Sequence, residues 1–447
     1  MFQKILIANR GEIAVRIIRA CREMGIKTVA VYSEADRDAL HAQLADEAVC
    51  IGPAAAQESY LNMERILSAT IATKAEAIHP GFGFLSENSK FVEMCEKCNV
   101  TFIGPSAAVI NKMGNKSEAR RTMMEAGVPV VPGSKRAGLY SWKKHLKQAK
   151  KIGFPIMIKA SSGGGGKGMR ISESREDFEE NFSTAQRESV NAFADNTMYL
   201  ERYVGRPRHI EVQIIADRFG QVVQLGERDC SIQRRHQKMI EESPSCAISE
   251  ELRRKMGETA VRAAKAVGYE SAGTIEFLLD KSGEFFFMEM NTRIQVEHPV
   301  TEFVSGVDLV KEQIRVAAGL PLSVKQEDIC MRGHAIECRI NAENPAKNFM
   351  PCPGVIENLH VPGGNGVRID TAVYNGYQIP PNYDSMIMKV IVHDKDRASA
   401  IAKMRSTLGE VIIEGVQTNL DFQYDILNQK DFLDGNVTTH FIEEHYE

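Results

Sequence analysis

Two periods of apolar residues alternate along residues 1–112. Four short, mostly apolar runs have the length and composition of buried strands. These runs cover residues 4–9, 27–33, 75–81 and 99–105. Two intervening segments, 11–25 and 61–74, carry apolar residues three and four positions apart, which predicts amphipathic helices. Because strands that alternate with helices form open parallel sheets, we expect a doubly wound α/β domain here.

The pattern changes after residue 112. Helical periodicity covers 115–127, 175–193 and 249–268, and strand-like runs cover 154–161, 169–174 and 197–204. Two hairpins are predicted, 208–230 with a turn at Asp217–Gly220 and 273–291 with a turn at Asp280–Gly283. Residues 331–447 contain short strands with proline- and glycine-rich turns, and we expect a β-rich domain ending in one or two helices.

The stretch KASSGGGGKGMR (159–170) is difficult to explain by packing, because glycine is costly to order and adds nothing to a core. It is not a GxxxxGK[ST] phosphate loop, since Gly168 stands where Ser or Thr is needed. The GxGxxG match is weak, because the residues after it favour a strand over a helix. Strand, glycine tip and strand form a flap, which either covers phosphates with backbone N–H groups or is a surface hairpin.

Composition excludes several classes of protein. The chain is 43% hydrophobic and 26% charged with a net charge of −4, so it lacks the basic surface of a nucleic-acid binder. No apolar run is long enough to span a bilayer, and the apolar stretch near the N-terminus is too short for a signal peptide. Nine scattered cysteines fit a reducing cytoplasm. The pair Cys95 and Cys98 lacks the second pair that a zinc site needs, so we expect two free thiols.

Candidate chemistry is concentrated in the second hairpin. A turn centred near Ser282 places Glu276 beside Met288 and Glu289, and an offset of one residue would bring the two carboxylates directly opposite each other. Asn291 shares the strand face of Glu289. Acidic and amide oxygens among phenylalanines suit Mg²⁺, which prefers oxygen ligands and keeps substrate phosphates in its shell. The alternative is a pair of solvated carboxylates.

Polar residues follow at once in NTRIQVEHP (291–299). If this segment is extended, Arg293, Gln295 and Glu297 share a face, where Arg suits a small planar oxyanion and Glu297 a base. The same residues could form a surface ion-pair ladder of little energetic value. Several basic residues also interrupt apolar strands; they are Lys116, Lys159, His209, His236 and Lys238. Together with the flap, this set indicates Mg-nucleotide binding with phosphoryl transfer.

A further strand, GHAIECRINAE (333–343), alternates in period two. Glu337, Arg339 and Asn341 are predicted on one face, which we expect to be solvated.

Six segments, taken in order, closely resemble biotin carboxylases, the ATP-grasp components of biotin-dependent carboxylases. They are ILIANRGEIAVRIIRA, HPGFGFLSEN, IKASSGGGGKGMR, ERDCSIQRRHQK, MEMNTRIQVEHPVTE and CRINAE. RIQVEHPVTE and QRRHQK are the specific ones, and the resemblance covers nearly the whole chain. It implies an N-terminal doubly wound domain at 1–112, an ATP-grasp core at 113–330 with a lid at about 131–204, and a C-terminal β-rich domain at 331–447.

The resemblance also implies a role for individual positions. Nucleotide-binding positions would be Lys116, Lys159, Glu201, Val204, His209, Gln233, His236, Glu276, Leu278 and Glu289, with Gly165, Gly166 and Met169 in the lid. Metal ligands, for Mg²⁺ or Mn²⁺, would be Glu276, Glu289 and Asn291. Bicarbonate would be held by Lys238, Arg293, Gln295 and the Val296 N–H. Glu297 would take its proton, and Arg339 would stabilise the biotin enolate.

The implied reaction has two steps. Bicarbonate attacks the γ-phosphate of MgATP to give carboxyphosphate, and the carboxyl group passes to N1′ of biotin. A lid is needed because carboxyphosphate is labile in water. The reaction would be the first half of acetyl-CoA carboxylase activity, feeding malonyl-CoA and fatty acid synthesis. The alternatives are a biotin carboxylase of another acyl-CoA or pyruvate carboxylase, another ATP-grasp carboxylate–amine ligase, or a nucleotide-binding protein without catalysis.

Implied partners are a biotin carboxyl carrier protein, a carboxyltransferase and a second copy of the chain in a homodimer. Met388-Lys389 is half of a biotin acceptor motif, but Lys389 lies in a strand-like run, not at an exposed turn. We therefore expect biotin to arrive on a separate protein. Two positions depart from the family: Phe82 stands where Tyr is usual, and Thr439 where an apolar residue is common near adenine.

Overall fold

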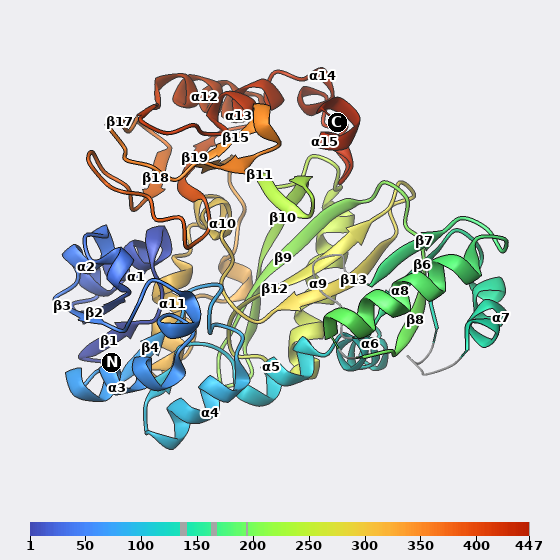
Figure 1. Cartoon of the computed structure of the whole chain (residues 1–447), viewed down its shortest axis with the longest axis horizontal. Helices are drawn as coiled ribbons and strands as arrows, with labels where there is room; N and C mark the ends of the chain where they lie inside the picture. Colours follow the sequence, from blue (N-terminus) through green and yellow to red (C-terminus); the bar gives the residue numbers. More distant parts are fainter. Residues whose placement is uncertain (135–140, 162–167, 194, 447) are drawn as a thin grey trace.

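The computed structural model describes residues 1–134, 141–161, 168–193 and 195–446 (Figure 1). Its strands form a five-stranded, an eight-stranded and a three-stranded sheet, with two further two-stranded sheets. Figure 1 shows the three-stranded sheet at the opposite end of the molecule from the N-terminal sheet, with the eight-stranded sheet between them. This mixed α/β arrangement confirms the predicted fold class.

The N-terminal sheet is parallel throughout, with strand order β3-β2-β1-β4-β5. Its strands are β1 (Lys4–Ile7), β2 (Lys27–Tyr32), β3 (Glu47–Cys50), β4 (Ala77–His79) and β5 (Thr101–Phe102). Its helices are α1 (Gly11–Glu23), α2 (Leu40–Leu44), α3 (Met63–Thr73) and α4 (Ser89–Lys97). Ile5 and Ile7 pack against α1, whereas Leu6 packs against α3 and α4. Helices on both faces explain why Ile5, Leu6 and Ile7 of β1 are all apolar, and they confirm the doubly wound prediction.

The three-stranded sheet has the order β7-β6-β8 and is antiparallel. Two helices, α5 (Ala107–Gly114) and α6 (Lys116–Glu125), precede it, and α7 (Trp142–Ile152) and α8 (Phe178–Phe193) pack on it. Strands β6 (Ile156–Ala160) and β7 (Met169–Ser172) flank the glycine loop and pair in antiparallel fashion, so the two predicted strands of the flap are confirmed. Gly165 and Gly166 lie outside the described residues. Strand β8 (Met198–Arg202) completes the sheet.

The eight-stranded sheet has the order β13-β12-β9-β10-β11-β14-β19-β18. Its first five strands are β9 (Arg208–Ala216), β10 (Val222–Arg234), β11 (Gln237–Ser243), β12 (Ser271–Leu279) and β13 (Phe285–Asn291). Both predicted turns are confirmed, since Gly220 N–H donates to the Asp217 carbonyl and Gly283 N–H to that of Asp280. The associated helices are α9 (Glu250–Val267), α10 (His298–Ser305) and α11 (Leu309–Ala317).

Residues after 331 extend this same sheet. Its last three strands are β14 (His334–Asn341), β18 (Val367–Thr371) and β19 (Met386–Asp394), and the join is made by β11 and β14. The smaller sheets pair β15 (Glu343–Asn344) with β16 (Met350–Pro351), and β17 (Asn358–His360) with β20 (Ile412–Glu414). Short 3₁₀ helices are η1 (Glu34–Asp36), η2 (Ala56–Glu58), η3 (Gln326–Asp328) and η4 (Pro345–Lys347).

The expectation of one or two terminal helices was wrong. The structure has α12 (Arg397–Glu410), α13 (Leu420–Ile426), α14 (Lys430–Leu433) and α15 (Phe441–Tyr446). The last three are too short to show a clear helical period, and such short helices depend on tertiary packing for their stability. Ile426, Phe432 and Phe441 supply that packing, because each is buried in one core with the strands of the large sheet.

All nine cysteines are free in the described part of the chain, with Cys95 buried and Cys98 exposed. Among the helices that the structure describes, none has the length and apolar composition needed to cross a membrane.

Candidate active site

A row of charged residues crosses four neighbouring strands of the large sheet. Glu289 on β13 lies opposite Glu276 on β12, which in turn lies opposite Glu211 on β9. The next residue in the row is Arg228 on β10, opposite Glu211. Residues in such positions have Cβ atoms about 5 Å apart, and like charges there repel. Three carboxylates can share this row only if cations balance them.

A β-bulge sets this register. Phe277 lies opposite Phe287, whereas Glu276 lies opposite Glu289, so Met288 is an extra residue in β13. The bulge supplies the offset of one residue that the sequence left open. It also turns Met288 outward, where its side chain is partly exposed. Asn291 is buried and its Nδ2 donates to Glu276 Oε1 at 2.8 Å.

Of the described cations, Lys238 contacts the most acids of this site. It comes from β11, and its Nζ lies 2.6 Å from Glu211 Oε2, 3.1 Å from Glu276 Oε1 and 2.6 Å from Glu297 Oε1. Burial alone would raise the pKa of Glu276, but Lys238 and then His209 hold that pKa well below its usual range. His209 Nε2 lies 3.1 Å from Glu276 Oε2. Among the described residues, no cation lies as close to Glu289, and burial together with Glu276 raises the pKa of Glu289.

Arg228 is the member of the row on β10, and it is fully buried. Its guanidinium donates to Glu211 Oε1 at 2.5 Å and to Gln295 Oε1 at 2.8 Å. Gln295 Nε2 donates to Glu276 Oε1 at 2.8 Å. Arg228 therefore both neutralises Glu211 and orients the Gln295 amide towards the acidic row.

Glu297 connects this row to Arg339. Its side chain is 2% exposed, and Arg339 Nη2 donates to its Oε2 at 2.8 Å. Burial alone would raise the pKa of Glu297, but Lys238 and Arg339 hold that pKa well below its usual range. Arg339 also pairs with Glu241. Burial and the nearby Glu297 raise the pKa of Glu241 to about 7 in spite of that pair.

The expectation of a solvated polar face around Arg339 was wrong. Glu337 is fully buried and lies opposite Glu241 on β11, and the Arg339 side chain is only 16% exposed. Helix α10 packs over β14 on this side, so the polar face belongs to the interior.

The predicted extended conformation after Asn291 is also wrong. The backbone bends at Thr292 and Arg293 and turns at Val296 and Glu297 before α10 begins. Arg293 Nε donates to Glu87 Oε2 at 2.8 Å, and its Nη2 donates to Asn291 Oδ1 at 3.1 Å. The segment nevertheless brings Arg293, Gln295 and Glu297 close to the acidic row. The turn places these side chains together, whereas the sequence had predicted that they would share one face of an extended strand.

Glu201 marks the side of the site nearest the glycine flap. It lies on β8 and accepts hydrogen bonds from Arg120 Nη1, at 2.9 Å, and from Lys159 Nζ. Lys159 is on β6, and this pairing raises its pKa although burial opposes the change. The predicted nucleotide residues Lys159 and Glu201 are thus in contact.

The remaining predicted nucleotide positions surround this region. Leu278 lies opposite His209 and Gln233 lies opposite Lys238 in the large sheet. Lys116 begins α6 and is near enough to Glu289 to lower its pKa in part. Met169 begins β7, Val204 follows β8, and His236 is exposed in the β10–β11 turn with a φ of 65°. The contacts described above do not include His236 or Val204.

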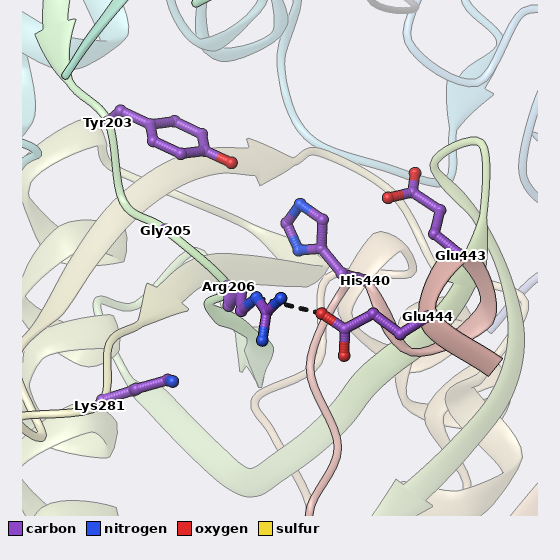
Figure 2. A pocket seen from close by; sticks show the side chains of 7 residues that line it. All are labelled: Tyr203, Gly205, Arg206, Lys281, His440, Glu443 and Glu444. Carbon is purple, nitrogen blue, oxygen red and sulfur yellow. Dashed lines mark ion pairs between the residues drawn. The ribbon is translucent and has the colours of Figure 1, made fainter. Parts of the chain in front are cut away.

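Figure 2 shows a pocket of about 570 Å³ between the segment after β8 and the start of α15. It is lined by Tyr203, Gly205, Arg206, Lys281, His440, Glu443 and Glu444. Arg206 Nε and Glu444 Oε1 pair at 3.1 Å. Val204 and Thr439 are chain neighbours of these residues, so the pocket adjoins predicted nucleotide positions. Its lining does not include the carboxylates around Lys238.

Five described residues of the site were not found by sequence reasoning: Glu87, Arg120, Glu211, Arg228 and Glu241. A signal existed for Glu211, because His209, Glu211 and Gln213 alternate in period two within an otherwise apolar strand. Arg228 likewise stands between two acids in a strand. Glu87 reaches the site from the N-terminal domain, over 200 positions from Arg293, and no local pattern indicates it.

Comparison with known families matches the chain in three consecutive parts. Residues 1–110 match "Biotin carboxylase, N-terminal domain", 115–325 match "Carbamoyl-phosphate synthase L chain, ATP binding domain", and 337–444 match "Biotin carboxylase C-terminal domain".

Individual relatives are similar over the whole length. Biotin carboxylase 1 of Bacillus subtilis is 57% identical over 444 residues, covering 99% of this chain and 98% of the relative. A crystal structure of a biotin carboxylase–βγ-ATP complex from Campylobacter jejuni has a TM-score of 0.95 at 51% identity and covers 100% of this chain and 99% of its own. A second crystal structure is the biotin carboxylase domain dimer of Hydrogenobacter thermophilus 2-oxoglutarate carboxylase with MgADP, ADP and bicarbonate. It has a TM-score of 0.94 at 50% identity, and the match covers 100% of this chain and 98% of that one.

Proposed function

The chain belongs to the biotin carboxylase family, and from that premise we propose how its residues divide the ATP-dependent carboxylation of biotin. Bicarbonate attacks the γ-phosphate of MgATP, and the carboxyl group of the resulting carboxyphosphate passes to biotin. Phosphoryl transfer of this kind depends on positioning and on neutralising charge. Three groups of residues serve these ends: a nucleotide group, a bicarbonate group and Arg339.

One observation carries the proposal. Glu297 is a buried carboxylate held ionised between Lys238 and Arg339, at the end of a row of acids. Lys238 shares its three protons among three carboxylates, so an arriving bicarbonate anion competes directly for it. As Lys238 turns to the substrate, Glu297 loses its closest cation and becomes a stronger base. Binding of the anion thereby prepares the group that accepts its proton.

Bicarbonate is held between this lysine and the bend after Asn291. Arg293 presents a planar guanidinium that Glu87 and Asn291 orient from two sides. Gln295 and the Val296 N–H complete the donors. These groups recognise a small planar anion with three oxygens better than a single ammonium would.

The nucleotide group comprises the residues near Glu201 and the first members of the acidic row. We assign Lys159, Glu201 and His209 to binding of the triphosphate, together with Met169 at the start of β7. Gly165 and Gly166 are assigned to the lid by the family resemblance alone. Glu276, Glu289 and Asn291 supply only oxygen ligands, which suits Mg²⁺ or Mn²⁺ brought with ATP. The raised pKa of Glu289 fits this assignment, because a divalent cation would relieve its repulsion by Glu276. When bound, the metal neutralises charge on the phosphates.

Arg339 receives biotin. A guanidinium beside the ureido oxygen stabilises the enolate that forms when N1′ loses its proton. The biotin is not attached at Lys389, because that side chain is fully buried within β19. We therefore propose a separate biotin carboxyl carrier protein, together with a carboxyltransferase, as partners.

We also propose that the chain forms a homodimer in the cytoplasm and acts in acetyl-CoA carboxylase and fatty acid synthesis. The proposed domains are 1–112, 113–330 with a lid at about 131–204, and 331–447. A dimer is supported by the solved domain dimer from Hydrogenobacter thermophilus.

The test measures ADP release with MgATP, with and without bicarbonate and free biotin. We expect turnover that requires bicarbonate and rises with biotin. The variant Glu297→Gln should keep nucleotide binding and lose this turnover. Turnover that is indifferent to bicarbonate but stimulated by an amine would instead identify another carboxylate–amine ligase. Tight nucleotide binding without turnover in the wild type would overturn the enzymatic proposal.

A further inference from the structure

Two buried donors outside the predicted site hold the backbone on either side of Val296. His298 Nδ1 lies 2.8 Å from the Gln295 carbonyl oxygen, and Lys389 Nζ lies 2.8 Å from the Val296 carbonyl oxygen. Both side chains are fully buried. We propose that His298 and Lys389 are positioning residues for bicarbonate, which fix the direction of the Val296 N–H and the place of Glu297. This inference rests on the proposed function of the site.

The geometry of the peptide bond explains how His298 acts. A peptide unit is planar and trans, so the Gln295 C=O and the Val296 N–H belong to one plane and point in opposite directions. Holding the carbonyl oxygen against His298 directs the N–H to the other side. Among the described residues, none accepts a hydrogen bond from the Val296 N–H, which leaves it available to an anion. Unpaired N–H groups are rare away from ligands and water.

The tautomer of His298 follows from its partner. A carbonyl oxygen only accepts, so Nδ1 must carry the proton. Nε2 is buried without a hydrogen-bond partner in the described residues. Burial and the nearby Lys389 hold the pKa of His298 well below its usual range, so the ring stays neutral. A neutral donor fixes the peptide without adding charge near the base.

Lys389 holds the next peptide, between Val296 and Glu297. With the peptide planes on both sides fixed, the φ and ψ angles of Val296 are fixed as well. The position of the Glu297 Cα atom, which belongs to the second plane, is then also fixed. In the sheet, Lys389 on β19 lies directly opposite Arg339 on β14 and Asp370 on β18. It therefore connects the loop that holds bicarbonate to the strand that carries Arg339.

The charge of Lys389 is balanced from two other parts of the chain. Its Nζ lies 3.3 Å from Glu12 Oε1 on α1 and 3.7 Å from Asp370 Oδ2. Glu12 has no conventional hydrogen bond in the described part of the protein, although it is buried. A buried Lys–Glu pair that is broken on one side leaves an uncompensated charge, so variants must be paired to separate folding from positioning.

The experiment compares matched variants in the full chain by the KM for bicarbonate, the KM for ATP and kcat. His298→Asn keeps an amide nitrogen at the δ position, whereas His298→Leu has similar bulk and no donor. Lys389→Met removes the donor, and the double variant E12Q/K389M removes the unpaired carboxylate as well. We expect His298→Leu and the double variant to raise the KM for bicarbonate about tenfold or more, with the KM for ATP within about twofold. His298→Asn should recover most of the loss.

Two outcomes would overturn the proposal. One is an unchanged bicarbonate KM in folded His298→Leu protein. The other is an equal loss for bicarbonate and ATP in all the variants, which indicates a structural role only. Circular dichroism and thermal unfolding establish which variants fold, and if those at 389 do not, the His298 pair decides the question. A failure of the proposed function is distinct, because wild-type protein would then lack bicarbonate-dependent turnover.

Discussion

Replacing Lys238 by Met removes the central cation of the acidic row while keeping its length and apolar stem. The ammonium contacts three carboxylates at 2.6, 3.1 and 2.6 Å. With an effective dielectric constant of about 20, each contact gives roughly 5–6 kcal/mol of Coulomb attraction, most of which desolvation offsets. Removing one member of a buried ionic group typically costs about 3–5 kcal/mol of unfolding free energy. We expect a loss of that size near neutral pH.

The pH dependence tests the cause of this loss. In the wild type, the pKa values of Glu276 and Glu297 are held low, so their contribution is present above the unfolded pKa of about 4.3 and is lost as pH falls through the folded values. In the variant these carboxyl groups lose Lys238, and their folded pKa values rise. They then become protonated as pH falls, and the difference between the two proteins should shrink from about pH 8 to about pH 5.5.

Urea unfolding followed by circular dichroism at several pH values measures this difference. Fluorescence of Trp142, the single tryptophan, reports the three-stranded sheet separately, because Trp142 packs against its core, and should be little changed. Lys325→Met is the matched control, since its side chain is 72% exposed and should alter stability by less than about 0.5 kcal/mol. A loss in Lys238→Met that is the same at every pH would refute the electrostatic explanation and indicate lost packing.

Three further predictions concern activity. Glu297→Gln should reduce bicarbonate-dependent ADP release by roughly 10²–10⁴-fold with little change in thermal stability, because Lys238 and Arg339 keep their other acidic partners; a large drop in melting temperature would contradict this. Arg339→Ala should uncouple ATP hydrolysis from carboxylation, measured as ADP formed per carboxybiotin trapped, and a parallel fall in both would argue against an enolate role. Glu289→Gln should raise the Mg²⁺ concentration needed for half-maximal activity, whereas Glu284→Gln, on the exposed part of the same hairpin, should leave it unchanged.

Much of the secondary structure could be predicted from the sequence, because the signals for strands, helices and turns lie within short segments of the chain. Apolar period and turn chemistry operate over a few residues, and they predicted four of the five strands of the N-terminal sheet, both hairpins and the strands that flank the glycine loop. Strand β3 was missed. The same signals failed for α13, α14 and α15, whose few residues form helices only against the large sheet.

The site was predicted unevenly for a related reason. Motifs with specific residues, such as QRRHQK, RIQVEHPVTE and CRINAE, led to the assignment of Lys238, Glu297 and Arg339 by resemblance to a family. The assignment of roles remains a prediction, and the structure shows that Glu297 contacts both Lys238 and Arg339. The predicted geometry was wrong in two places. The chain after Asn291 is bent and not extended, and the polar face of β14 is covered by α10 and not solvated. Whether a polar strand face is solvated depends on what packs over it, and that element lies elsewhere in the sequence.

The sequence alone determined which residue types are available and approximately where most of the strands and the longer helices lie. Only the tertiary structure decided which charges meet. Glu289, Glu276 and Glu211 form a row because a bulge at Met288 shifts one strand by a single residue. Lys238 on β11 balances the charge of that row, and Lys389 on β19 donates to the Val296 carbonyl, about 90 positions away in the sequence. Electrostatic energy depends on distances of a few ångströms, which are set by strand register and packing, not by separation along the chain.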